Sequence, residues 1–251
     1  MKHIKRGVSL VKSDKDFFQR FPVGAVFGVT IGILLLTVSF EFIGQFRIFR
    51  DFVFIVEFLK NTIGVIVIAY FSFEILLYFI KFSPTKKFEK NLSEIRSTFL
   101  ENVTKNGTSL IGDFISFRPW MEDEFYVKSK KGIPNIFFPT YLVAFTVKDN
   151  ILYITEAKAM IQEKSYSISG YHVVPIKLVS SSSFFQDRIL FSAKAGEVSA
   201  TTYFLEIRTV SGSVKIALFE EEILSKYGNI NQMKEEFISK IMMIIRMLNK
   251  S

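Results

Sequence analysis

Cysteine is absent from this 251-residue sequence. Its absence excludes disulfide bonds, zinc ribbons, iron–sulfur clusters and thiol nucleophiles. Glycine and proline are also few, with 13 and 6 residues, which excludes collagen-like and low-complexity chains. Apolar residues, by contrast, make up 49% of the chain, and 29 residues are phenylalanine. This composition predicts a folded chain with more apolar surface than a typical soluble domain needs for its core.

The sequence also lacks the motifs of common enzyme and cofactor sites, including GxGxxG after an expected strand, GxxxxGK[ST], HExxH and GxSxG. Its two histidines are His3, in a terminal tail, and His172, beside an expected strand, where a structural role is the better interpretation. The acidic runs 122–124 and 220–222 fit a solvated run or a helix N-terminus better than a metal site, and the serines 180–183 fit a loop. The sequence therefore predicts a protein that is not an enzyme, with no catalytic, metal or cofactor site.

Two long apolar runs dominate the first third of the chain. Residues 22–43 carry no charged side chain before Glu41, and residues 61–80 carry only Glu74. Helices of about twenty apolar residues match a hydrocarbon core about 30 Å thick. A signal peptide is the alternative for the first run, but the run is too long and no cleavage site follows it. We therefore expect a transmembrane hairpin over residues 21–82, with helices at 22–43 and 61–80.

The basic residues around these runs predict an orientation. Six precede the first run, four follow the second, and two lie in the expected turn at 44–51. Because lysine and arginine are concentrated on the cytoplasmic side of membrane proteins, both ends are expected in the cytoplasm. The prediction is a multi-pass protein of the inner (cytoplasmic) membrane, with a basic cytoplasmic segment at 1–20. The basic residues are Lys2, Lys5, Arg6, Lys12, Lys15 and Arg20, then Arg47 and Arg50, then Lys81, Lys86, Lys87 and Lys90.

Two features inside the apolar runs are candidates for a specific role. Gly24, Gly28 and Gly32 recur every four residues, which predicts a face for close helix packing, although glycine is common in membrane helices. Glu74 is an acid at a costly position, so a functional role facing protein or water is one interpretation. The other is that Glu74 reaches the cytoplasmic interface, because it lies about 10 Å along the helix from Lys81.

The rest of the chain reads as one helix followed by a β-rich domain. Residues 83–107 place apolar side chains at helical spacing, so an amphipathic connecting helix is expected there. From 108 to 251 the pattern is mainly β, with hairpin turns at 148–150 and 211–213. The chain ends in a helix whose apolar face is expected to cap the sheet. That face consists of Phe237, Ile241, Ile244, Ile245 and Leu248.

One part of the β-rich region combines a hairpin strand, a Pro-x-x-x-Val/Ile-Ser-Ser segment, a late hairpin with glycine at its turn, and the terminal helix. The first two segments are Leu152-Tyr153-Ile154-Thr155 and Pro175-Ile176-Lys177-Leu178-Val179-Ser180-Ser181. In this pattern residues 140–248 resemble the bacterial membrane-anchored pleckstrin-homology-like (PH-like) families. The resemblance implies an antiparallel PH-like sheet or barrel capped by the C-terminal helix. Lipid-binding members carry several basic residues at the first hairpin loop, where this sequence has only Lys148, so phosphoinositide recognition is not implied.

The sequence thus predicts a membrane α-helical hairpin of two transmembrane helices plus a cytoplasmic α+β domain. Three classes of function remain. The first is an adaptor or assembly module that binds other membrane or cytoplasmic proteins at the bilayer. The second is a ligand-gated effector or sensor, whose β-domain binds a small signal such as a nucleotide and drives formation of a homo-oligomer; an aromatic or strongly cationic pocket would favour it. The third is a subunit of a transport or secretion complex. Nucleic acid is not an expected partner, because the net charge of +8 is spread over both halves.

Overall fold

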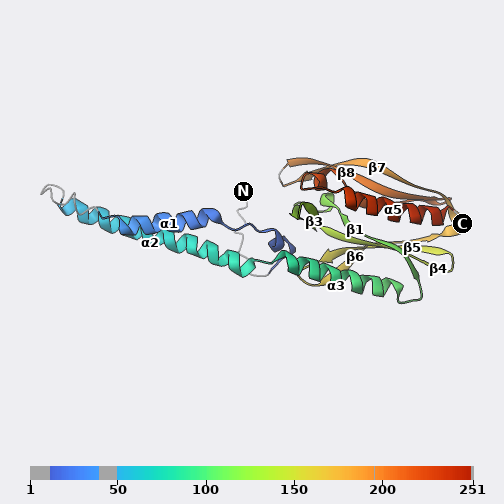
Figure 1. Cartoon of the computed structure of the whole chain (residues 1–251), viewed down its shortest axis with the longest axis horizontal. Coiled ribbons are helices and arrows are strands. Elements are labelled where there is room, and N and C mark those ends of the chain that lie inside the picture. Colours follow the sequence, from blue (N-terminus) through green and yellow to red (C-terminus); the bar gives the residue numbers. More distant parts are fainter. Residues whose placement is uncertain (1–11, 40–49, 195, 250–251) are drawn as a thin grey trace. The chain divides into compact units, whose positions relative to one another are not determined.

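The computed structural model describes residues 12–39, 50–194 and 196–249, and these form two compact units (Figure 1). Of the described residues, the first unit holds Lys12 and those within 19–82. The second unit holds residues 13–18 and those from 83 onward. The chain therefore contributes a short segment to the second unit, forms the first unit, and then returns. The sequence had assigned 13–18 to a basic N-terminal segment, of which residues 1–11 lie outside the described part.

The first unit consists of two helices, α1 (Val23–Thr37) and α2 (Arg50–Lys81). At 1.5 Å per residue, the 15 residues of α1 extend about 22 Å and the 32 residues of α2 about 48 Å. Helix α1 ends at Thr37 because Val38 adopts an extended backbone, with φ −72° and ψ 121°. Within the described chain, one helical run is long and apolar enough to cross a membrane by length and composition, and it begins at Phe52.

The predicted hairpin of two transmembrane helices is therefore wrong. The first expected span, 22–43, yields a helix about 22 Å long, which is shorter than the roughly 30 Å of a hydrocarbon core. The apolar run continues past the end of the helix, and apolar composition alone does not reveal where the backbone leaves the helical conformation. Residues 44–49 of the expected turn lie outside the described residues. The last two positions of that turn, 50 and 51, belong to α2, which begins at Arg50.

The second unit is built on a four-stranded antiparallel sheet in the order β1-β4-β5-β6. Strands β4 and β5 are joined by a two-residue turn in which Asp149 and Asn150 both have positive φ, at 51° and 62°. Such turns match the twist of antiparallel strands and favour aspartate and asparagine. The bounds are β1 (Ser109–Phe117), β4 (Thr140–Lys148), β5 (Ile151–Met160) and β6 (Ser165–Pro175).

The remaining strands form two further antiparallel sheets, one with the order β7-β8-β9 and the other with β2 and β3. The four-stranded sheet and the sheet of β7, β8 and β9 are called the two larger sheets below. Residues 180–183, expected in a loop, belong to strand β7. The bounds are β2 (Tyr126–Lys130), β3 (Ile133–Phe138), β7 (Val179–Ala193), β8 (Gly196–Thr209) and β9 (Gly212–Glu220). Short 3-10 helices lie at η1 (Asp14–Phe18), η4 (Pro119–Met121) and η5 (Ile176–Leu178).

Helices cover both faces of the four-stranded sheet. Figure 1 shows α3 (Thr85–Thr104) along one side of it, and α5 (Asn231–Leu248) on the other side, next to the sheet of β7, β8 and β9. The core between the two larger sheets includes Phe145, Leu205 and Phe237. The core under α3 includes Phe88 and Phe99. A short helix of four residues, α4 (Glu222–Ser225), follows β9.

Segment η1 packs into the core under α3. Phe17 is fully buried, and its ring meets that of Phe88 edge-on at 5.3 Å between centroids. The carboxylate of Asp14 accepts hydrogen bonds from the backbone N–H groups of Ile161, at 3.0 Å, and Gln162, at 2.7 Å. Segment η1 is therefore part of the second unit by apolar packing as well as by hydrogen bonding.

The predicted PH-like sheet or barrel is also wrong, and the second unit supports only the broader class, α+β. Its strands form separate antiparallel sheets, and β6 is an edge of the four-stranded one. The resemblance rested on residues 140–248, whereas the first strand of that sheet, β1, begins at Ser109. Between 110 and 139 the sequence showed only short strand-like runs at 114–117 and 125–127, which overlap β1 and β2. Prolines and an irregular apolar pattern concealed the full length of these strands, and β3 was not predicted.

Candidate functional site

The glycine stripe lies where the two helices of the first unit meet. A Cβ atom at Gly28 would overlap the ring of Phe71, and one at Gly32 would lie 2.5 Å from Cγ1 of Ile68. Gly24, in contrast, is exposed, with open space around its Cα. Two of the three predicted glycines therefore allow close approach of α1 to α2 of the same chain.

Replacing Gly28 with leucine is expected to destabilise the α1–α2 pair by about 1–3 kcal/mol, because the new side chain must displace the ring of Phe71. Thermal unfolding of the purified chain in detergent measures this loss. Gly24→Leu is the matched control and should leave the melting temperature unchanged. Equal melting temperatures for the two variants would show that close packing at Gly28 contributes nothing.

Glu74 is exposed on α2 and has no hydrogen bond or ion pair to any residue that the structure describes. Neither interpretation of this acid is thereby decided, and its role stays a prediction.

The apolar face of the last helix has a definite place. Phe237, Ile241 and Ile244 are buried in the core between the two larger sheets, as is Leu248, while Ile245 is half-buried against it.

The strongest candidate for a binding site is a groove of about 480 Å³ at the end of α3. The last turn of α3 and the segment after it form one wall, and the α3-facing sides of β4, β5 and β6 form the rest. We call it the tyrosine groove. It is lined by Asn102, Val103, Asn106, Thr108, Thr146, Lys148, Tyr153, Thr155, Tyr166, Ile168 and Tyr171.

Three tyrosines give this groove its aromatic character. The rings of Tyr153 on β5 and Tyr171 on β6 lie side by side, with centroids 6.3 Å apart and planes inclined by 32°. Tyr166 packs edge-on against Phe99, and its hydroxyl accepts a hydrogen bond of 2.7 Å from Nδ2 of Asn102. Tyr166 is thus fixed in place, whereas Tyr171 is 59% exposed.

Two threonines in the groove have unused hydrogen-bonding capacity. Thr146 on β4 and Thr155 on β5 are only 2% and 6% exposed. Both residues line the groove, and their hydroxyls make no hydrogen bond to any described residue. In the described chain, the fully buried side-chain atoms that lack a partner are Oδ1 of Asn135 and Oγ1 of Thr202, so the hydroxyls of Thr146 and Thr155 keep some access to solvent. They can therefore pair with a polar ligand or with water. Lys148 is the one charged side chain in the lining, and its Nζ donates to the backbone oxygen of Asn106 at 2.7 Å.

Strand β6 borders the groove as an open edge of the sheet. Its register with β5 places Tyr166, Ile168, Tyr171 and Val173 on the α3-facing side, since they pair with residues of β5 on that side. Ile168 and Val173 are 53% and 51% exposed. Strand β6 contains no charged residue, and charges are a common device against edge-to-edge pairing.

On the opposite side of the same sheet, a buried ion pair joins Arg118 to Glu156, with exposures of 8% and 7%. Nη2 of Arg118 also donates to the backbone oxygen of Ala217 on β9, at 2.8 Å. Nε2 of His172 lies 3.1 Å from Oε1 of Glu156. His172, which the sequence favoured as structural, therefore contacts a charged cluster that connects the two larger sheets.

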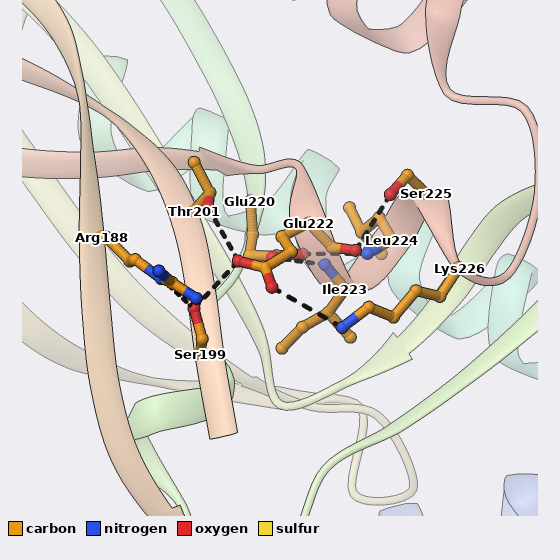
Figure 2. Close-up of polar contacts among 9 residues, drawn as sticks. All are labelled: Arg188, Ser199, Thr201, Glu220, Glu222, Ile223, Leu224, Ser225 and Lys226. Carbon is orange, nitrogen blue, oxygen red and sulfur yellow. Dashed lines mark hydrogen bonds and ion pairs between the residues drawn. The ribbon is translucent and has the colours of Figure 1, made fainter. Parts of the chain in front are cut away.

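The acidic run 220–222 connects the end of β9 to the short helix α4, which begins at Glu222; Figure 2 shows Glu220 and Glu222. Glu220 is fully buried, and its carboxyl oxygens accept from the N–H groups of Ile223, at 2.7 Å, and Leu224, at 3.0 Å. Burial raises the pKa of Glu220 to about 7, although the two N–H groups act in the opposite direction. Glu222 accepts from the hydroxyls of Ser199 and Thr201, and Figure 2 shows both contacts. This run therefore organises a turn between β9 and α5.

The raised pKa of Glu220 predicts how stability depends on pH. Between the ordinary pKa of 4.5 and the native value of about 7, the native state holds a proton that the unfolded state has released. The free energy of unfolding should therefore fall by about 3 kcal/mol as the pH rises through this interval. Glu220→Gln should lose this decrease, which urea unfolding at acidic and at mildly basic pH would measure. Glu222→Gln is the comparison: burial is the main cause of the raised pKa of Glu220 and the charge of Glu222 a smaller one, so most of the decrease should remain.

No family model, curated protein or solved structure matches this chain. The resemblance to PH-like families accordingly stays a prediction. The tyrosine groove itself was missed by sequence reasoning, because it joins residues near 102–108 to residues near 146–171. The local signal in the sequence was the spacing of Tyr153 and Thr155, which are two residues apart and so lie on the same side of an expected strand.

Proposed function

We propose that this protein is a membrane-anchored binding module that recognises a small ligand in the tyrosine groove. The observation that carries the proposal is an aromatic cavity of about 480 Å³ whose lining includes two threonines with hydroxyls that no described residue pairs with. Ligand sites are commonly clefts of about 300–1,000 Å³ with a few placed polar groups. An aromatic pocket is the feature that favours a ligand-responsive protein over a plain adaptor among the classes that the sequence left open.

The apolar surface of α2 supports the anchor. Phe54, Phe58 and Phe79 on this helix are 75%, 64% and 62% exposed, and such side chains are stable in lipid rather than in water. Basic residues follow the helix, at Lys81, Lys86, Lys87 and Lys90. By the positive-inside tendency, they support a cytoplasmic position for the second unit.

Alkaline carbonate extraction of membranes tests the anchor. The wild-type chain should stay with the membrane fraction. Replacing both Ile66 and Leu76, which are 61% and 54% exposed, with lysine should release it, because each lysine costs about 2.5–3.5 kcal/mol in a membrane helix. Val210→Lys in the second unit, at an 86% exposed position, is the matched control. Release of the wild-type chain by carbonate would contradict the anchor.

A thermal-shift screen of small metabolites tests ligand binding. Compounds that stabilise the wild-type chain should fail to stabilise Thr146→Val and Thr155→Val, since valine keeps the shape of threonine and removes its hydroxyl. Without ligand, both variants should melt at or above the wild-type temperature, because neither loses a hydrogen bond. Hits that stabilise both variants as strongly as the wild type would contradict binding in the groove.

A second candidate, the adaptor or assembly module, is favoured by strand β6. An uncharged edge strand with a row of exposed apolar side chains can accept an extended segment of another protein as an added strand. Cross-linking from a photoreactive residue placed at Val173 tests it. Capture of one specific protein, abolished by Ile168→Lys, would support the adaptor.

A further inference from the structure

We propose that the ligand of the tyrosine groove is a neutral sugar ring, either of a free saccharide or of a glycolipid head group. This inference rests on the proposed function and names the chemistry of the ligand. Three properties of the lining carry it: its charge, its hydrogen-bonding groups and the arrangement of its rings.

The charge of the lining favours an uncharged ligand. Among the eleven lining residues none is acidic, and Lys148 is the one basic residue. Its ammonium group already donates to the backbone oxygen of Asn106. A phosphate or carboxylate group is usually bound by several cationic or N–H donors, often by arginine in a bidentate pair. The groove therefore suits neither a nucleotide nor an acidic metabolite.

The hydrogen-bonding groups favour a ligand with hydroxyls. The hydroxyls of Thr146 and Thr155 can each donate one bond and accept two, and the side-chain amide of Asn106 offers two donors and one acceptor. Hydroxyl groups of a ligand likewise donate and accept, so they can pair with all three residues. Filling these positions with hydroxyls would satisfy groups that the chain itself leaves unpaired.

The rings favour a ligand with a flat apolar face. The rings of Tyr153 and Tyr171 are neighbours, with 6.3 Å between centroids and planes inclined by 32°. This separation leaves no room for a planar base between the two rings, so a ligand would lie against them from outside. The faces of aromatic rings are negative, so they attract the weakly positive C–H groups that line one face of a pyranose ring.

Saturation-transfer NMR on the full chain in phosphatidylcholine nanodiscs tests the proposal. The probes are methyl glucoside, methyl galactoside and methyl N-acetylglucosaminide, with adenosine as a ring of another class. We expect at least one glycoside to bind, with the strongest transfer to its ring C–H protons. Thr155→Val and Tyr171→Ala should each weaken binding about ten-fold or more. Tyr227→Ala, which removes a tyrosine 43% exposed outside the groove, should leave it unchanged.

A second arm separates the two sources of the sugar. Nanodiscs that contain a glycosyl lipid should prevent binding of the soluble glycoside if the ligand is a membrane head group, and should have no effect if it is a free saccharide.

Three results would overturn the sugar assignment. One is the absence of binding by any glycoside, and another is glycoside binding that both groove variants retain. The third is binding of adenosine alone; if both variants lost it, the ligand-binding function would stand while the sugar assignment failed.

Discussion

Phe237→Ala is expected to lower the free energy of unfolding of the second unit by about 3–5 kcal/mol, the usual cost of truncating a buried aromatic side chain. Phe237 is 4% exposed, and its ring stacks on that of Phe219 at 5.4 Å between centroids. The centroid of the Phe114 ring on β1 lies 5.7 Å from that of the Phe237 ring. The substitution would therefore leave a cavity between α5 and both larger sheets.

Urea unfolding followed by circular dichroism measures this loss. Met243→Ala is the matched control on the same helix, because Met243 is 53% exposed and should cost little. If both variants unfold at the wild-type urea concentration, α5 is not a core element, and an exposed interaction helix becomes the better description.

Arg118→Ala is expected to cost about 3–5 kcal/mol, because it leaves the carboxylate of Glu156 buried without its main partner. The lost hydrogen bond from Nη2 of Arg118 to Ala217 also removes a contact between the two larger sheets. The nearby imidazole of His172 cannot replace it, since it reaches only Oε1 of Glu156.

The double variant Arg118→Met with Glu156→Leu should recover most of that stability, because apolar residues of similar volume often replace a buried ion pair without loss. Lys158→Ala is the control for an ion pair nearer the surface. Lys158 pairs with Glu122, their side chains are 32% and 29% exposed, and its removal should cost no more than about 1 kcal/mol. If the double variant is as unstable as Arg118→Ala, apolar residues cannot replace the pair, and the ion pair itself contributes to the free energy of unfolding.

Local patterns predicted several elements of this fold. The turn between β4 and β5 lies within the predicted 148–150, because aspartate and asparagine adopt positive φ at low cost. The turn after β8 lies at 210–211, one residue before the predicted 211–213, and Gly212 is already the first residue of β9. The last helix was visible from its apolar spacing, and α3 from the spacing of Phe88, Ile95 and Phe99. In each case the signal lies within one segment of the chain.

The features that the sequence did not reveal depend on contacts between distant segments. Phe17 resembles any apolar residue of a tail until α3 is placed against it, and Thr155 resembles any strand threonine until Asn106 and Tyr171 surround it. The span 22–43 failed for another reason. Its composition is apolar beyond the point at which the helix ends, so composition could not set the boundary at Thr37.

The route of the chain has a practical consequence for anyone who wishes to produce the second unit alone. A gene fragment that starts at residue 83 or later omits Asp14 and Phe17. The ring of Phe88 then loses an aromatic neighbour, and the N–H groups of Ile161 and Gln162 lose their acceptor. Such a fragment should expose apolar surface and aggregate. Restoring the missing piece, either by fusing residues 13–18 ahead of residue 83 through a flexible linker or by adding it as a synthetic peptide, should return a soluble, cooperatively folding product.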